Sequence, residues 1–293
     1  MLSRGTVGML VILGSAFIGG TAFFFVWDHE HQVFSGLSPQ NPSPDQAFYA
    51  ELPATSTQAT DTIAATSTGK SIELPIVVYH IVRPSYPSDS AAVLAIALTP
   101  ETFAAEMQHL KAGGYHVVRF SDLEAYFKDG TALPSKPIIL SFDDGWGDQF
   151  VYAFPILEKY HYPATFFVFT NAIGRRGFLS WSDLHRMLAA GMTVGDHTRS
   201  HPYLTHITDQ AVLWDEIYGS KQTLEKRLGV PVNEIAYPFG MYDPAIVALV
   251  KKAGYLSARG DYWSGNRQTA DKLYALSAIN APTTTASFES RFP

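Results

Sequence analysis

The stretch that most constrains this chain is an apolar run ending in two adjacent carboxylates, Ile138 to Gly145, which reads IILSFDDG. The run follows Pro137, is too short for a helix and stops at a glycine, so it predicts a buried strand. Because side chains alternate along a strand, Asp143 and Asp144 can share one site only if the chain bends after Phe142. Neighbouring acids resist ionising together unless a cation or hydrogen bonds compensate them. The pair therefore indicates either a site of chemistry or a solvated Asp-Gly turn, which is also common.

Composition limits what kind of site this can be. The chain has 293 residues, 46% of them hydrophobic, which is enough for one sizeable core with appendages. The net charge of -6 and the lack of a dense Lys/Arg cluster argue against a nucleic-acid partner. There is no cysteine, so disulfides, thiol catalysis and Cys-ligated zinc are excluded. Any metal must be held by His, Asp or Glu.

The N-terminal region is predicted to be an anchor and a tether. Residues 5–27 carry no charge, which predicts a membrane-spanning helix in an anchor covering 1–28. Arg4 on its N-terminal side predicts that the rest of the chain lies outside the cytoplasm, in the periplasm or at the cell surface. A cleaved signal peptide is the competing interpretation, but the run is long and no small-x-small cleavage site follows it. Residues 29–70, rich in Ser, Thr, Pro, Ala and Gln, predict a disordered linker.

The folded domain is predicted to span 71–293 and to be α/β. Short apolar runs alternate with helical patterns; the runs lie near 75–80, 115–118, 138–142, 164–169, 191–195, 235–238 and 255–258. One helix is expected to begin after Thr99, which can cap it, another with a capping box at Ser121, and a longer one over roughly 209–228. The pattern predicts a parallel sheet covered by helices, and about seven such units favour a closed (β/α) barrel. His80 and the Asp143–Asp144 pair would then lie on the rim where barrel enzymes carry their chemistry.

A second chemical motif follows the predicted strand at 191–195. His197 and His201 are four residues apart, so on a helical turn they would share one face and reach a single ion. Such a pair is weak evidence alone, but it shares the predicted rim with the two aspartates. Two imidazoles and one carboxylate make a common catalytic site for zinc and its neighbours, and the second carboxylate could then act as a base.

Three motifs together resemble those of the polysaccharide deacetylases, carbohydrate esterase family four. They are Ser-Phe-Asp-Asp-Gly at 141–145, His-Thr-Arg-Ser-His at 197–201 and Ala-Tyr-Pro-Phe-Gly at 236–240. The resemblance covers about Pro75 to Ile279. It implies a distorted (β/α) barrel and an enzyme that removes acetyl groups from N-acetylated sugar polymers.

The resemblance also implies roles for the motif residues. Asp144, His197 and His201 would bind a divalent metal, with zinc expected first and nickel or cobalt as alternatives. Asp143 would be the general base that activates the attacking water. The metal would polarise the amide carbonyl and stabilise the oxyanion.

Two departures from the family pattern affect the catalytic assignment. Many members have an arginine, thought to orient the base, where this chain has Ala236, and a C-terminal Leu-His where it has Leu276-Ser277. No histidine follows His206, yet the leaving amine needs a proton, so His80 is our candidate general acid. The other interpretation is that His80 only packs on the rim. The Ala-Tyr-Pro motif with an N-terminal Tyr-His resembles the branch that includes poly-N-acetylglucosamine deacetylases.

Weaker expectations concern the substrate. Tyr237, Pro238 and Phe239 resemble the family's groove wall, Trp263 is expected to stack on a sugar or line the acetyl pocket, and Leu276 to help close that pocket; ordinary packing is the alternative for each. The sequence thus predicts a membrane-tethered deacetylase of a β-linked N-acetylglucosamine polymer, either an exopolysaccharide or peptidoglycan. One rival is a catalytically silent carbohydrate-binding protein. Another is a non-haem iron oxygenase, which the barrel pattern and the spare aspartate disfavour.

Overall fold

A computed structural model describes residues 13–18, 21–26, 62–63, 70–261 and 265–293. The chain divides into two compact units, Met1–Gln40 and Asn41–Pro293. The predicted linker over 29–70 falls almost entirely outside the described residues, and so does Trp263.

The described part of the first unit is a pair of strands. β1 (Leu13–Ile18) pairs antiparallel with β2 (Thr21–Val26), with Leu13 opposite Val26 and Ile18 opposite Thr21. The predicted membrane-spanning helix over 5–27 is therefore not found there, and no helix in the described part of the chain is long and apolar enough to cross a bilayer. Two glycines interrupt the apolar run at 19–20, and three phenylalanines flanked by threonine and valine favour strand over helix.

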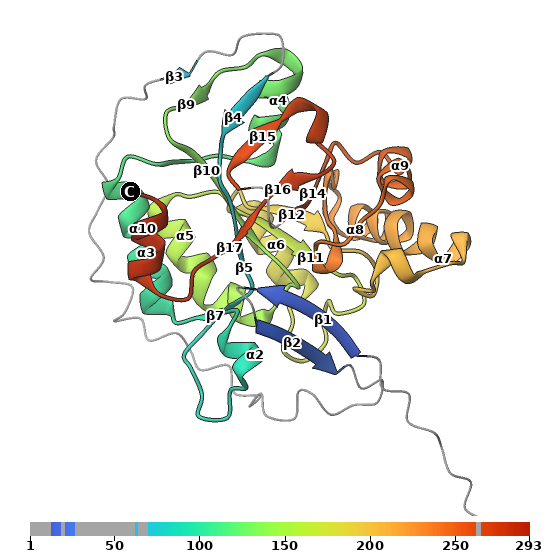
Figure 1. The fold of residues 1–293 in the computed structure, drawn as a ribbon, viewed down its shortest axis with the longest axis horizontal. Helices are drawn as coiled ribbons and strands as arrows, with labels where there is room; N and C mark the ends of the chain where they lie inside the picture. Colours follow the sequence, from blue (N-terminus) through green and yellow to red (C-terminus); the bar gives the residue numbers. More distant parts are fainter. Residues whose placement is uncertain (1–12, 19–20, 27–61, 64–69, 262–264) are drawn as a thin grey trace, which may run out of the picture. The chain divides into compact units, whose positions relative to one another are not determined.

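The second unit is built around a parallel sheet that curls into a nearly closed barrel (Figure 1). Its strands, in spatial order, are β16 (Leu276–Ser277), β14 (Ser257–Asp261), β13 (Glu234–Ala236), β12 (Thr193–Asp196), β11 (Thr165–Val168), β10 (Pro137–Phe142), β5 (Ile76–Tyr79) and β17 (Ile279–Asn280). The predicted α/β barrel is confirmed, with eight strands along this path rather than about seven.

One C-terminal stretch closes the barrel. β16 pairs with β14 and β17 pairs with β5, and only Ala278 separates these two short strands. In Figure 1 this red stretch lies beside β5, as the pairing requires. The predicted strand at 115–118 is not on the barrel path, since β8 (His116–Val117) pairs only with the start of β10.

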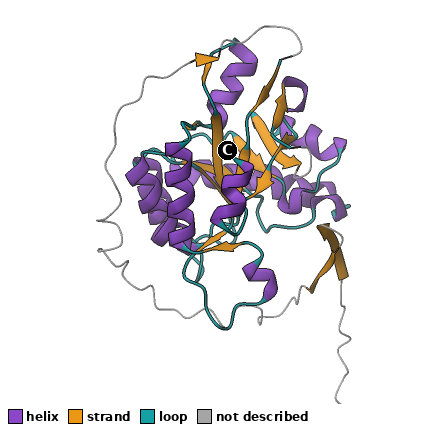
Figure 2. Cartoon of the chain, turned by 60° about the vertical axis from the view of Figure 1, so that its left-hand side comes forward, coloured by secondary structure: helices purple, strands orange, loops and turns teal. Residues whose placement is uncertain are grey.

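Helices surround the barrel strands (Figure 2). They are α2 (Ala91–Leu94), α3 (Pro100–Ala112), α4 (Phe120–Asp129), α5 (Phe154–Tyr160), α6 (Trp181–Ala189), α7 (Gln210–Trp214), α8 (Ser220–Leu228), α9 (Pro244–Lys252) and α10 (Thr285–Arg291). Short antiparallel pairs complete the strands: β4 (Ser71–Glu73) with β15 (Arg267–Thr269), and β3 (Thr62–Ile63) with β9 (Leu133–Pro134). β6 (Ile81–Val82) runs parallel to β7 (Ala97–Leu98).

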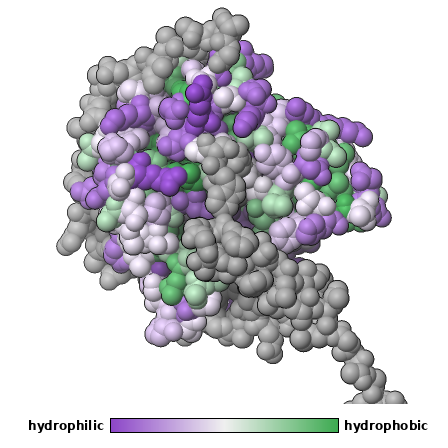
Figure 3. Space-filling view, viewed as in Figure 1, coloured by the Kyte–Doolittle hydropathy of each residue, from purple (hydrophilic) through white to green (hydrophobic). Residues whose placement is uncertain are grey.

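The barrel strands are buried on both faces. On β5, Ile76 and Val78 belong to one core cluster while Val77 and Tyr79 belong to another. The first cluster also holds α4 residues such as Leu123, and the second holds residues of the outer helices. Burial on both faces is why β5, β10 and β11 are apolar at nearly every position. On the outer face shown in Figure 3, polar residues are interspersed with apolar ones.

Two helix predictions need correction. Thr99 caps α3 as expected, but α4 begins one residue early, at Phe120, where Asp122 accepts a hydrogen bond from the backbone N–H of Arg119. The single helix predicted over 209–228 is instead α7 and α8 joined by a π-helical turn, η3 (Asp215–Gly219). Such turns are frequent at functional sites. This one carries Glu216, which accepts hydrogen bonds from the loop that contains His197 and His201.

Candidate active site

The chain bends sharply after β10, as the two adjacent aspartates require. The backbone N–H of Asp143 still donates to the Tyr79 carbonyl, at 2.9 Å, in sheet register. Asp144 and Gly145 then adopt left-handed backbone, with φ of 71° and 70°. A Cβ on Gly145 would lie 2.8 Å from a methyl group of Val168, so glycine is needed there for space as well as for φ. The bend presents both carboxylates to one site.

The histidines follow β12 in a loop rather than on a helical turn, which corrects the geometry expected from their spacing. Two non-glycine residues of this loop have left-handed φ, 70° at Thr198 and 61° at His201. The ring centroids of His197 and His201 are nevertheless 4.7 Å apart. The convergence was predicted, but its cause is a strained loop rather than helical periodicity.

Buried carboxylates hold the histidine loop in this conformation. Glu216 accepts hydrogen bonds from the backbone N–H of Arg199 (3.0 Å), the backbone N–H of Ser200 (2.8 Å) and the Ser200 hydroxyl (2.5 Å). At the other end, Asp196 accepts from the Thr198 N–H at 2.7 Å. Glu216 comes from η3, so a distant part of the chain shapes the loop.

Asp144, His197 and His201 present their ligand atoms to a common point. The Nε2 atoms of His197 and His201 lie 3.6 and 3.3 Å from Oδ1 of Asp144. One ligand atom from each of the three residues lies within 4.8 Å of the others. His197 Nδ1 lies 2.7 Å from the Ala236 carbonyl, so the donor is Nδ1–H and Nε2 is left as a lone-pair ligand. This donor set fits a divalent cation.

Asp143 is paired with an arginine that the sequence analysis missed. The guanidinium of Arg259, on β14, donates to Oδ1 of Asp143, and both side chains are almost fully buried. The same guanidinium lies over the Phe167 ring, 5.0 Å from its centroid. The arginine absent at Ala236 is thus supplied by the next strand of the sheet. The signal available in the sequence was a charged residue directly after the predicted strand near 255–258.

These contacts set the charge of the site. Burial by itself raises the pKa of Asp143, but Arg259 and then His197 outweigh it, so the pKa of Asp143 is lowered overall. Burial likewise raises the pKa of Asp144, and the neighbouring histidines bring it far below its usual range. Burial, followed by the charge of His197, lowers the pKa of His201 to about 4. The site therefore holds two ionised carboxylates and a neutral His201 at neutral pH. Burial lowers the pKa of His197, but Asp143 and Asp144 outweigh it and raise that pKa overall, so a cation bound at Nε2 would displace a proton from His197.

His80 lies on the same rim, one residue after β5. Since Tyr79 pairs with Phe142, His80 and Asp143 end neighbouring strands at the same level. The charge of His80 also acts on the pKa of Asp143, Asp144 and His201. The buried Gln149 joins the two strand ends, because its side-chain amide donates to the His80 carbonyl at 2.8 Å and to the Asp143 carbonyl at 2.7 Å. The position expected for His80 is confirmed, while its role as an acid stays a prediction.

The residues expected to contact the substrate differ in their exposure to solvent. Phe239 is 42% exposed, stacks on Tyr203 at 3.9 Å and meets His201 edge-on at 4.6 Å. Tyr237 is instead buried, with its hydroxyl donating to the Tyr274 carbonyl, and Pro238 and Leu276 are buried as well. Their predicted contacts with substrate, and that of Trp263 outside the described residues, stay predictions.

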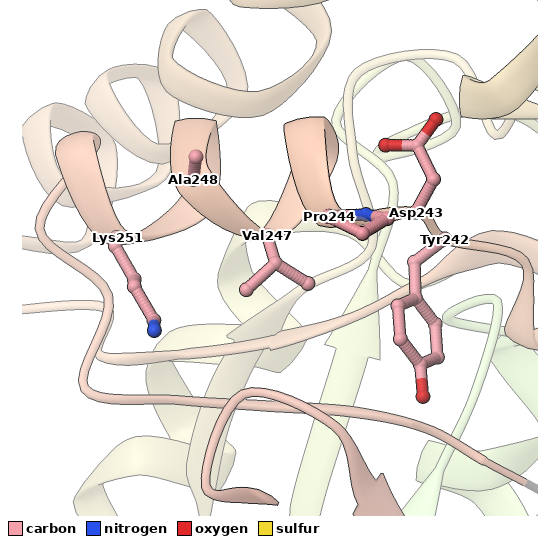
Figure 4. A pocket seen from close by; sticks show the side chains of 6 residues that line it. All are labelled: Tyr242, Asp243, Pro244, Val247, Ala248 and Lys251. Atoms are coloured by element: carbon pink, nitrogen blue, oxygen red, sulfur yellow. The ribbon is translucent and has the colours of Figure 1, made fainter. Parts of the chain in front are cut away.

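A surface cavity of about 470 Å³ lies beside α9, lined by Tyr242, Val247, Lys251 and their neighbours (Figure 4). Tyr242 stacks on Tyr237 at 4.8 Å, so this cavity borders the wall that carries the third motif. None of the candidate metal ligands lines it.

Comparison with known proteins identifies the family of this chain. The family model described as polysaccharide deacetylase matches residues 130–258. The poly-beta-1,6-N-acetyl-D-glucosamine N-deacetylase of Staphylococcus epidermidis is 30% identical over 204 residues, which cover 60% of this chain and 68% of that protein. The chain belongs to the polysaccharide deacetylase family. It is an enzyme of the class that hydrolyses amides, and the resemblance stated from the three motifs is confirmed.

Solved structures of deacetylases agree with this assignment. A polysaccharide deacetylase from Bacillus cereus is 28% identical, with a TM-score of 0.65 over 76% of this chain and 70% of that one. A Streptococcus pyogenes deacetylase, solved in complex with acetate, has a TM-score of 0.69 over 76% of this chain and 97% of that one, at 24% identity. At 24% identity, the Streptococcus pyogenes structure shows a shared fold alone. Membership in a hydrolase family leaves the oxygenase alternative without support.

Proposed function

We propose that this deacetylase removes N-acetyl groups from a β-linked N-acetylglucosamine polymer, an exopolysaccharide or peptidoglycan, and that it requires a divalent metal, zinc in the first instance. The observation that carries the proposal is the placement of Asp144, His197 and His201 beside the buried Asp143–Arg259 pair. The relatives named for poly-N-acetylglucosamine support the choice of sugar.

Asp143 is the proposed general base. Its Oδ2 lies 4.0 Å from Nε2 of His197, so the base and the ligand cluster face one space. Arg259 occupies the other oxygen, keeps the carboxylate ionised and fixes its direction. A metal held by the triad would activate water and polarise the acetamide carbonyl. The proton leaving the water is taken up at the Asp143 carboxylate.

His80 is the proposed general acid. An amine is a poor leaving group unless a proton reaches its nitrogen as the C–N bond breaks. His80 ends the strand next to that of Asp143, and Gln149 ties the two backbones together. The proposed acid and base therefore come from adjacent strand ends.

The test is acetate release from N-acetylglucosamine oligomers by the full-length protein. The β-1,6-linked and β-1,4-linked series are compared after chelation and zinc addition. We expect turnover that depends on zinc, is lost in Asp143→Asn, and is faster on one linkage. Turnover on β-1,4 oligomers alone would assign peptidoglycan-like substrates. No acetate from either series under zinc, nickel or cobalt would refute the proposal.

One of the two reasons for the alternative function, a catalytically silent carbohydrate-binding protein, no longer holds. That alternative relied on a missing arginine and a missing C-terminal histidine, and Arg259 now stands beside the candidate base. Glycan binding without any acetate release, in protein that binds zinc, would favour this alternative.

We also propose that the deacetylase domain acts outside the cytoplasm, at the membrane. The extracellular location of such polymers supports this, and so does the uncharged run at 5–27 with Arg4 before it, although no spanning helix is found in the described residues of that run. Fusing alkaline phosphatase after residue 70 tests it, because that enzyme folds actively only outside the cytoplasm. An inactive phosphatase fusion, together with fluorescence from a reporter that folds only in the cytoplasm and is fused at the same position, would contradict the proposal.

A further inference from the structure

The side chain of Trp146 contacts one of the candidate metal ligands directly. Its indole Nε1–H donates to Oδ2 of Asp144 at 3.0 Å. The other oxygen, Oδ1, is the one that faces Nε2 of His197 and Nε2 of His201. The two oxygens of Asp144 thus have different environments, because the indole contacts Oδ2 and the two histidines face Oδ1.

The ring of Trp146 is held in place by the segment at 177–179. Trp146 stacks on Phe178 with ring centroids 4.7 Å apart, and the two residues form an isolated antiparallel bridge. Backbone hydrogen bonds on either side, from Gly147 N–H to the Gly177 carbonyl and from Leu179 N–H to the Gly145 carbonyl, are both 2.8 Å long. The indole N–H is therefore preset in direction before any ion binds.

The same aromatic group reaches the histidine side of the site. Phe169 meets Phe178 edge-on at 5.5 Å, and its ring centroid lies 5.5 Å from that of His201. Asp144 and His201 are thus braced by one connected set of rings: Trp146, Phe178 and Phe169.

We propose that Trp146 is a positioning residue for the metal site: its indole N–H holds Asp144 so that only Oδ1 is presented to the ion. An aspartate carboxylate rotates readily about the bond that joins it to Cβ. When a neighbouring group already holds one oxygen, the conformational entropy of fixing the carboxylate is lost before the ion binds. The inference rests on metal binding by the triad, which is part of the proposed function.

The test replaces Trp146 with phenylalanine in the full-length protein. Phenylalanine keeps a ring to stack on Phe178 and removes only the N–H donor. Loss of a partner that orients a ligand weakens metal binding by roughly 10-fold to 100-fold, and we expect zinc affinity to fall in that range. Acetate release should recover at saturating zinc, and the thermal midpoint of the metal-free protein should stay near that of the wild type. Trp214→Phe, on α7, is the matched control and should bind zinc like the wild type.

The outcomes separate this inference from the function. Equal zinc affinity in the wild type and Trp146→Phe would overturn the role of Trp146 and leave the metal site standing. A wild type that binds no zinc would overturn both. If Trp146→Phe does not fold, indole ¹⁵N spectra of the wild type decide, with Trp27→Phe, Trp181→Phe, Trp214→Phe and Trp263→Phe assigning the other four of the five indole resonances. The Trp146 signal is expected to shift and saturate with zinc, and a signal that does not move would refute the proposal.

Discussion

Arg259 and Asp143 form a buried ion pair between side chains 116 residues apart in the sequence. β14, which carries Arg259, is separated from β10 by β13, β12 and β11, so the pair reaches across the inside of the barrel. A buried carboxylate without this partner would be costly. We predict that Arg259→Lys, which keeps the charge but loses the forked geometry, lowers kcat about 100-fold and leaves zinc affinity within a few-fold. Steady-state kinetics and zinc titration measure this, with Arg267→Lys as the surface control; unchanged kcat would contradict it.

The role of His80 can be separated from its mere presence on the rim. If His80 protonates the leaving amine, His80→Ala should lower turnover of N-acetylglucosamine oligomers by about 100-fold to 10,000-fold. Hydrolysis of an aryl acetate should fall far less, because a phenolate leaves without a proton. The ratio of the two activities is the measurement. His185→Ala, exposed on α6, is the control, and an equal loss on both substrates would argue for a packing role.

Glu216 is predicted to matter for the metal site without touching it. It accepts three hydrogen bonds from Arg199 and Ser200, which shape the loop between the two histidines. Glu216→Gln should cost roughly 1–3 kcal/mol of stability and weaken zinc binding, because the amide cannot accept at both of its ends. Denaturant unfolding and zinc titration test both effects. Glu289→Gln, exposed on α10, should change neither; zinc affinity like that of the wild type in Glu216→Gln would show that the loop holds its shape without the carboxylate.

A buried glutamate should make stability depend on pH. Burial raises the pKa of Glu106 to about 8, outweighing the hydrogen bond that it accepts from the Tyr79 hydroxyl at 2.9 Å. A carboxyl with a raised pKa stabilises the fold fully below its unfolded pKa of 4.5, and this contribution is lost as the pH rises through about 8. Glu106→Gln cannot ionise, so its stability relative to the wild type should improve between pH 4.5 and 8, by up to about 4 kcal/mol.

Thermal or denaturant unfolding at several pH values measures this difference. Glu101→Gln, exposed at the start of the same helix, is the matched control. A constant difference between Glu106→Gln and wild type over this pH range would show that Glu106 is not held protonated.

Local patterns in the sequence predicted most of the barrel strands and the candidate site. The apolar runs marked the barrel strands from β10 to β13, because a strand buried on both faces must be apolar at nearly every position. The Asp-Asp-Gly ending of β10 demanded a bend, and the His-x-x-x-His spacing together with the aspartates predicted the metal ligands. Each of these inferences depends on residues within a few positions of one another, where chain geometry limits the possibilities.

Contacts between distant parts of the chain decided the rest. Arg259 reaches Asp143 only because the sheet curls, and a barrel closed by two-residue strands leaves no periodicity to read at 276–280. The histidine loop has left-handed residues because Glu216 and Asp196 satisfy its backbone donors, so the two histidines converge as predicted but not through helical spacing. The sequence by itself singled out the two aspartates and two histidines of the candidate site. The tertiary structure decided which of them are paired, because buried charge and strained backbone are stable only where partners from other strands compensate them.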